Sequence, residues 1–230
     1  MTVRVRTSVP GLRIQGVMAT PSVQPAPAVL VLHEIAGLDR AVRDACDRLA
    51  SAGYVAFAPD LYARHFKPFC IAQTLVRLAR NEQPPVGDLT RYVEWLRRQP
   101  GVAPDAVGAI GFCMGGGFAL ALAIAGGISA TGVNYGGVPA TLDEVRGVCP
   151  VVASYGGDDE RFAADGRRLE SFLFELGVAH DIKIYDGATH SFMNEHHPRL
   201  VRRLFTVRYD PAATEDAWTR TLSFFDAHLD

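Results

Sequence analysis

A glycine-rich turn at residues 111–117 joins two apolar segments that favour different structures. The segment before it, 106–110, is short and apolar, as expected of a strand buried on both faces of a parallel sheet. The segment after it, 118–125, is rich in alanine and leucine and favours a buried helix. Between them stands Gly-x-Cys-x-Gly, the nucleophile-elbow pattern with cysteine where serine is usual. We therefore expect a strand, a sharp turn and a helix in direct succession.

The elbow pattern predicts a strained backbone at its central residue, Cys113. Such a turn leaves no room for side chains at its flanks, which accounts for Gly111 and Gly115. The turn would project the Cys113 sulfur out of the sheet at the N-terminus of a helix, where the helix dipole favours thiolate over thiol. A buried cysteine without chemistry is the alternative interpretation of this turn taken alone.

Strand-like and helix-like segments alternate along the rest of the chain. We expect strands at 3–9, 12–19, 28–32, 54–58, 130–135, 151–155 and 180–185. We expect helices at 38–52, 71–81, 87–99, 162–176 and 211–229. This alternation predicts an α/β fold, with a mostly parallel central sheet and helices on both faces. With 230 residues and 48% hydrophobic content, the chain can bury one large core, so we expect a single domain over residues 1–230.

Charge and cysteine content narrow the classes of partner. The net charge of −2 shows no basic excess, which argues against nucleic acid or an anionic membrane as a partner. Residues 1–7 lack the apolar core of a signal peptide, and no apolar run approaches the roughly 20 residues of a membrane span. The cysteines are scattered without CxxC or zinc spacing, at Cys46, Cys70, Cys113 and Cys149. We expect a cytoplasmic monomer or small homo-oligomer with reduced thiols, no metal and no cofactor.

Polar residues follow several of the predicted strands: Glu34, Cys113, Asp159 and His190. Ligand sites of open parallel sheets form beyond the carboxyl ends of the strands. The order nucleophile, acid, histidine is that of α/β-hydrolases. A histidine within hydrogen-bond reach can take the thiol proton, and an aspartate on the far ring nitrogen fixes the tautomer and stabilises the imidazolium. Asp158 and Asp159 both fit the acid role on this reasoning.

Two backbone N–H groups are candidates for an oxyanion hole, those of Met114 and Ile35. Each well-placed donor could lower the barrier by about 3 kcal/mol. Glu34 would lie at the lip of the pocket. A carboxylate beside Cys113 would keep the thiol protonated, and so protected from oxidation, until substrate arrives. A buried structural carboxylate is the alternative role for Glu34.

Five segments together resemble the dienelactone hydrolase family, also known as carboxymethylenebutenolidases: 34–37, 58–64, 111–116, 156–159 and 187–192. The likeness extends from Val29 to the C-terminal helix. It implies an α/β-hydrolase fold and a hydrolase that opens a lactone or small carboxylic ester through an acyl-enzyme. The closest substrate by analogy is dienelactone.

The resemblance also implies roles for individual residues. The family pattern Gly-Gly-x-Asp selects Asp159 over Asp158 as the acid. Cys113 would be the nucleophile and His190 the base, and Glu34 would hold the resting thiol until substrate displaces it. The two backbone donors named above would form the oxyanion hole.

The chain departs from the family pattern where the family binds a substrate carboxylate with two arginines. One arginine lies two residues after His-Ser-Phe, a position held here by Asn194. The other belongs to a region that is shorter here, and its candidates are Arg64, Arg77 and Arg80. The segment 195–209, rich in Arg and His, also differs from the family and could contribute to the pocket, although His196 and His197 are expected to be surface residues rather than metal ligands.

The substrate is therefore not defined by the resemblance. Our candidates for substrate binding are Arg64, Tyr135, Phe192 and Asn194, with Phe112 and Phe162 as further aromatic lining. A carboxylesterase or thioesterase of another substrate is one alternative function. A non-catalytic, redox-sensing protein with a reactive Cys113 is another, but it would need a resolving cysteine near the elbow, and we identify none.

Overall fold

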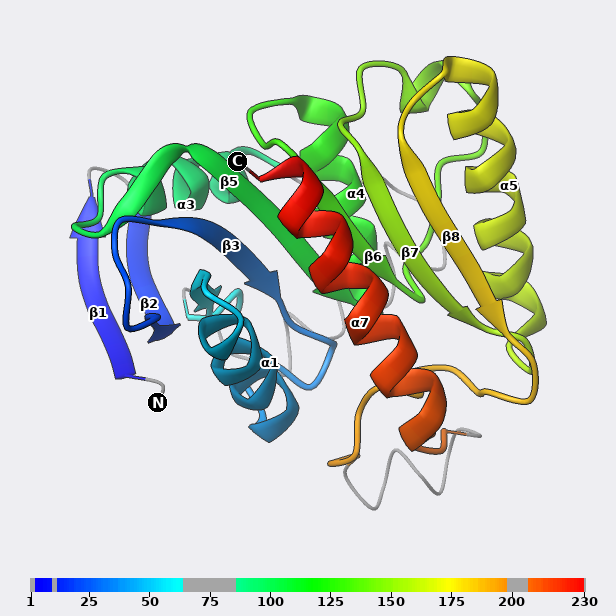
Figure 1. Cartoon of the computed structure of the whole chain (residues 1–230), viewed down its shortest axis with the longest axis horizontal. Coiled ribbons are helices and arrows are strands. Elements are labelled where there is room, and N and C mark those ends of the chain that lie inside the picture. The colour runs from blue at the N-terminus through cyan, green and yellow to red at the C-terminus, as the bar shows by residue number, and fades with distance from the viewer. Residues whose placement is uncertain (1–2, 10–11, 64–85, 198–206, 230) are drawn as a thin grey trace.

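The structure is a computed structural model that describes residues 3–9, 12–63, 86–197 and 207–229 (Figure 1). The predicted helix at 71–81 lies outside the described residues, as do Arg64, Cys70, Arg77 and Arg80.

The described strands form one eight-stranded sheet in the order β1-β2-β4-β3-β5-β6-β7-β8. The strands are β1 (Val3–Val9), β2 (Leu12–Ala19), β3 (Ala26–Leu32), β4 (Val55–Pro59), β5 (Val102–Phe112), β6 (Thr131–Asn134), β7 (Val151–Gly156) and β8 (His180–Tyr185). β2 pairs antiparallel with both β1 and β4, and all other pairs are parallel. The predicted mostly parallel sheet is therefore confirmed, and its parallel strands all end at the same edge.

Helices cover both faces of this sheet, as predicted. They are α1 (Arg40–Ser51), α3 (Gly87–Arg97), α4 (Met114–Ala125), α5 (Glu160–Leu176) and α7 (Pro211–His228), with a short 3-10 helix at Asp143–Val145. In Figure 1, α1 and α7 lie in front of the sheet and α3 and α4 behind it. Among these described helices, none combines the length and the apolar character that a membrane span requires.

The helix after the elbow begins earlier than the sequence predicts, at Met114 rather than at residue 118. The glycines 115–117 favour a turn by intrinsic propensity, but here they form the first turn of α4. They allow the helix to approach neighbouring strands closely. A Cβ atom on Gly116, for example, would lie 2.7 Å from the carbonyl oxygen of Asn134. Close packing thus overrides local propensity.

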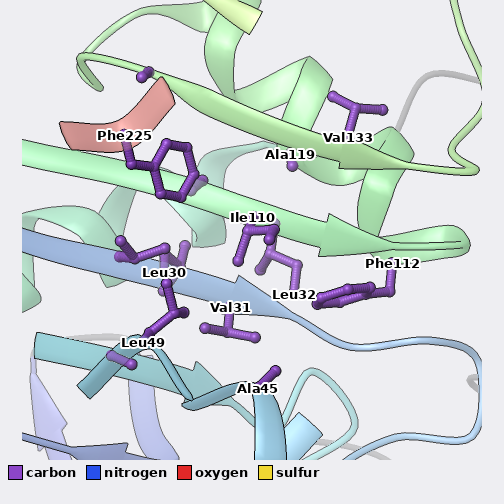
Figure 2. Close-up of a cluster of buried hydrophobic side chains, with 14 of the residues drawn as sticks. Leu30, Val31, Leu32, Ala45, Leu49, Ile110, Phe112, Ala119, Val133 and Phe225 are labelled. Atoms are coloured by element: carbon purple, nitrogen blue, oxygen red, sulfur yellow. The ribbon is translucent and has the colours of Figure 1, made fainter. Parts of the chain in front are cut away.

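The core lies where β3 and β5 cross the centre of the sheet (Figure 2). Leu30, Val31 and Leu32 of β3 are completely buried, which explains the unbroken apolar run of this strand. Leu49 of α1 and Phe225 of α7 belong to the same cluster. Full burial of one such side chain stabilises the fold by about 1.5–3 kcal/mol. This packing gives a rigid base to the loops that follow β3 and β5.

Candidate active site

The backbone turns sharply at Cys113, between β5 and α4. Cys113 has φ 54° and ψ −117°, a conformation that side-chain-bearing residues rarely adopt. A Cβ atom on Gly111 would lie 1.8 Å from the carbonyl oxygen of Gly115, and one on Gly115 would lie 2.1 Å from that of Leu32. The strained elbow and the need for both flanking glycines are therefore confirmed.

Three side chains from distant parts of the chain meet at this elbow. The Sγ atom of Cys113 lies 3.1 Å from Nε2 of His190, and the Nδ1 atom of His190 lies 2.5 Å from Oδ2 of Asp159. The loop after β8 carries His190, and the loop after β7 carries Asp159. Asp158 is exposed to solvent. The structure thus brings together the predicted sulfur, imidazole and carboxylate, and places Asp159 rather than Asp158 against the ring.

His190 is mostly enclosed, with 23% of its side chain exposed. Burial lowers the pKa of His190, but the hydrogen bonds with Asp159 and Cys113 outweigh this effect and raise the pKa to about 10. The rings of Phe162 and Tyr135 pack against the imidazole at centroid distances of 4.7 and 5.3 Å. The site therefore favours an imidazolium that faces an acidic group at each nitrogen.

The Glu34 carboxylate, in the loop after β3, has two hydrogen-bond donors. Its Oε1 accepts from the hydroxyl of Tyr135 at 3.2 Å, and its Oε2 accepts from Nδ2 of Asn194 at 3.0 Å. Burial raises the pKa of Glu34, and the hydrogen bond from Asn194 partly offsets this rise. Within the described residues, no hydrogen bond joins Glu34 to Cys113. The expectation that Glu34 holds the resting thiol therefore stays a prediction.

The loop that carries Glu34 and Ile35 is fixed by two aromatic side chains that our sequence reasoning did not single out. His33 donates from Nδ1 to the carbonyl of Glu34 at 2.7 Å and accepts at Nε2 from the N–H of Leu61 at 3.2 Å, which makes its ring neutral. The hydroxyl of Tyr62 donates to the carbonyl of Ile35 at 3.0 Å and also lies 3.6 Å from the Met114 sulfur. The only sequence signal for Tyr62 was its place in the family-like segment 58–64.

The candidate substrate-binding residues have different environments. Phe192 is completely buried between the rings of Tyr135 and Tyr185, at centroid distances of 5.6 and 5.2 Å. Its predicted contact with substrate is therefore wrong, because it is a core residue. Tyr135 is also fully buried, and its hydroxyl is bonded to Glu34. Asn194 is buried as well and contacts the same carboxylate.

A cavity of about 210 Å³ lies beside Glu34, between α1 and α7. Tyr135 and Asn194 contribute to its wall, whereas Cys113 and His190 do not. The wall carries the carboxylates of Glu34, Asp39, Asp44, Glu195 and Glu215. Its basic groups are already paired, Arg48 with Glu215 at 2.7–2.8 Å and His196 with Asp44 at 3.0 Å.

Part of the segment 195–209 borders this acidic cavity, through Glu195, His196 and Tyr209. His196 is half-buried there rather than a free surface residue, as is His197, whose Nε2 lies 3.1 Å from the carbonyl of Ser191. Phe112 also lines the cavity, and Phe162 packs on His190 instead.

Comparisons with known proteins agree on one family. A sequence model described as the Dienelactone hydrolase family matches residues 14–229. The carboxymethylenebutenolidase of Pseudomonas putida is 30% identical over 186 residues, which are 76% of this chain and 78% of that protein.

Solved structures share the fold. The dienelactone hydrolase of Anabaena variabilis superposes with a TM-score of 0.77 at 20% identity, over 100% of this chain and 99% of that one. An α/β hydrolase from a deep-sea metagenome library superposes with a TM-score of 0.65 at 13% identity, over 98% of each chain. This likeness confirms the predicted α/β-hydrolase fold.

Proposed function

The chain belongs to the dienelactone hydrolase family, and from this membership we propose that it hydrolyses a lactone or small carboxylic ester with a Cys113–His190–Asp159 triad. That it is a hydrolase of the dienelactone hydrolase type follows from its family and its relatives. The triad and the acyl-enzyme are our proposal. The observation that carries it is the 3.1 Å distance between the Cys113 sulfur and His190 Nε2, with Asp159 on the opposite ring nitrogen.

The proposed reaction begins with attack of the Cys113 thiolate on the substrate carbonyl carbon. The resulting tetrahedral oxyanion collapses, the C–O bond of the ester breaks, and the His190 imidazolium gives its proton to the leaving oxygen. The now neutral imidazole then takes a proton from water, and the hydroxide attacks the thioester. Expulsion of the sulfur releases the carboxylic acid and restores the thiolate–imidazolium pair. Asp159 stabilises the imidazolium each time it forms.

The proposed oxyanion hole consists of the N–H groups of Ile35 and Met114. The position of Tyr62 supports this assignment, because its hydroxyl bonds the carbonyl of Ile35 and lies close to the Met114 side chain. One side chain thus holds together the two segments that carry these donors. Donors fixed before the reaction need no reorganisation as the negative charge develops.

The described cysteines argue against the redox-sensing alternative. The described thiols are free, and burial raises the pKa of both Cys46 and Cys149 to about 12. A thiol that stays protonated at neutral pH is a poor partner for disulfide exchange with Cys113. Within the described residues, the chemistry of Cys113 is therefore better suited to ester hydrolysis.

Ester turnover coupled to labelling of Cys113 tests the proposal. Purified protein is assayed with p-nitrophenyl acetate and, in parallel, with a dienelactone, before and after graded alkylation by iodoacetamide. We expect activity to fall in proportion to alkylation of Cys113, and we expect Cys113→Ala to lose it. The ratio of the two turnover rates separates a lactonase from a general esterase. Turnover that survives Cys113→Ala would contradict the proposal.

A further inference from the structure

Asn194 contacts two carboxylates at once. Its Nδ2 atom lies 3.0 Å from Oε2 of Glu34 and 3.5 Å from Oδ2 of Asp39. Its Oδ1 accepts from the backbone N–H of His196 at 2.8 Å, and this bond fixes the orientation of the amide. The nitrogen must therefore face the acids. Asn194 supplies the hydrogen-bond donors that let two acidic side chains lie side by side.

Tyr135 provides the second hydrogen bond to the Glu34 carboxylate, from the side of the triad. Its hydroxyl donates to Glu34 Oε1, while its ring packs edge-on against the His190 imidazole. Glu34 is thus separated from the catalytic ring by one tyrosine. The backbone of Tyr135 has φ 40°, an unfavourable conformation for a residue with a side chain, which the surrounding packing must hold in place.

With both carboxylate oxygens of Glu34 engaged, the Cys113 sulfur has only the imidazole as its polar partner among the described residues. We propose that Asn194 is a positioning residue that, together with Tyr135, holds the Glu34 carboxylate away from Cys113, so that the Cys113–His190 pair is ready for attack before any substrate binds. This inference rests on the proposed function, since it describes the resting state of the same nucleophile. It differs from the sequence-based expectation that Glu34 holds the resting thiol, and thiol reactivity without substrate distinguishes the two.

The consequence of losing Asn194 follows from charge. Without the shared donor, Glu34 keeps only its hydrogen bond from Tyr135, and repulsion between the carboxylates of Glu34 and Asp39 favours a turn of Glu34 toward the elbow. A carboxylate beside Cys113 disfavours the thiolate, by a factor of roughly ten for each unit by which the thiol pKa rises. Thiol reactivity in the absence of substrate therefore reports the position of Glu34.

The test measures the rate at which iodoacetamide alkylates Cys113 at pH 7 without substrate, with the modified peptide quantified by mass spectrometry. We expect rapid alkylation of the wild type. In Asn194→Leu, which keeps the size of the side chain but removes its donors, we expect a rate at least roughly tenfold lower. Adding Glu34→Gln to Asn194→Leu should restore the rate to within about threefold of wild type. Adding Asp44→Asn instead, which removes another carboxylate from the same cavity wall, should restore nothing.

Tyr135→Phe provides a second route to the same result if Asn194→Leu does not fold. It removes one hydrogen bond to Glu34 and should slow alkylation in the same direction, again reversibly by Glu34→Gln. The proposal fails if wild-type Cys113 is alkylated as slowly as in the variants, if Asn194→Leu has no effect, or if Glu34→Gln does not restore the rate. Ester turnover is a separate readout, so its absence would contradict the proposed function without deciding the alkylation result.

Discussion

Asp159 immediately precedes α5, and its carboxylate bonds to Nδ1 of His190 at 2.5 Å instead of capping the helix. Aspartate at such a position usually accepts from the first N–H groups of its helix. Here the carboxylate makes no cap hydrogen bond. The local helix gives up a stabilising contact, and the imidazole gains a fixed orientation and a charge partner.

Asp159→Asn should lower kcat for ester hydrolysis at least about a hundredfold with little change in fold, because an amide cannot stabilise the imidazolium and can favour the wrong tautomer. Steady-state kinetics with p-nitrophenyl acetate measure the loss. Asp158→Asn is the matched control, since this neighbouring carboxylate is exposed. It should stay within about twofold of wild type. Equal losses of kcat in the two variants would show that Asp159 does not act in the triad.

Stability should depend on pH through His190. Its pKa is raised from 6.5 to about 10 in the folded protein, so the folded state retains a proton that the unfolded state has lost. The contribution is complete below pH 6.5 and disappears as pH rises through about 10. Urea denaturation at pH 6, 8 and 10 should show wild type losing up to about 1.4 kcal/mol per pH unit relative to His190→Gln within this window. Parallel pH profiles for the two proteins would refute the prediction.

Tyr62→Phe should reduce kcat by roughly fivefold while KM changes little. The substitution removes the hydroxyl that bonds the carbonyl of Ile35, and a hydrogen bond of this kind contributes about 1 kcal/mol. Because the proposed oxyanion hole acts on the transition state, its loss should appear in kcat. Tyr54→Phe removes a tyrosine hydroxyl elsewhere in the core and should leave kcat unchanged; a similar drop there would indicate a general effect on packing.

Gly115→Ala should destabilise the fold by about 3 kcal/mol or prevent folding. Its methyl group would lie 2.1 Å from the carbonyl oxygen of Leu32, and backbone cannot easily move aside at the centre of the sheet. Gly87→Ala is the control, because a Cβ at this helical position meets no atom of the described residues within 4 Å. It should be neutral or stabilising by about 0.5 kcal/mol. Urea denaturation at one pH compares both with wild type.

The fold could be predicted from the sequence where local pattern and tertiary environment agree. The apolar run of β3 matches a strand buried on both faces, and the Gly-x-Cys-x-Gly pattern matches the strained conformation at Cys113. The start of α4 could not be predicted, since three successive glycines argue against a helix until the neighbouring backbone is known. Local propensity alone carries no information about that close approach.

The candidate site, like the fold, could be predicted from the sequence only in part. Cys113 and His190 stand 77 residues apart, yet chain order and strand ends were enough to pair them. The partners of Glu34 were not foreseen, because Tyr135 and Asn194 lie 101 and 160 residues away and belong to no motif that names a partner. The core position of Phe192 was equally hidden, since an aromatic residue after a strand suits a pocket and a core alike.

The position of His33 affects how substitutions in one loop can act on another. Its ring is hydrogen-bonded both to the chain after β3 and to the chain after β4, and so links these two loops. A displacement that begins near Leu61 reaches the backbone at Glu34, one residue before Ile35, through a single imidazole. If the N–H of Ile35 belongs to the oxyanion hole as proposed, we expect substitutions in the second loop to change the reaction rate without any contact with the triad.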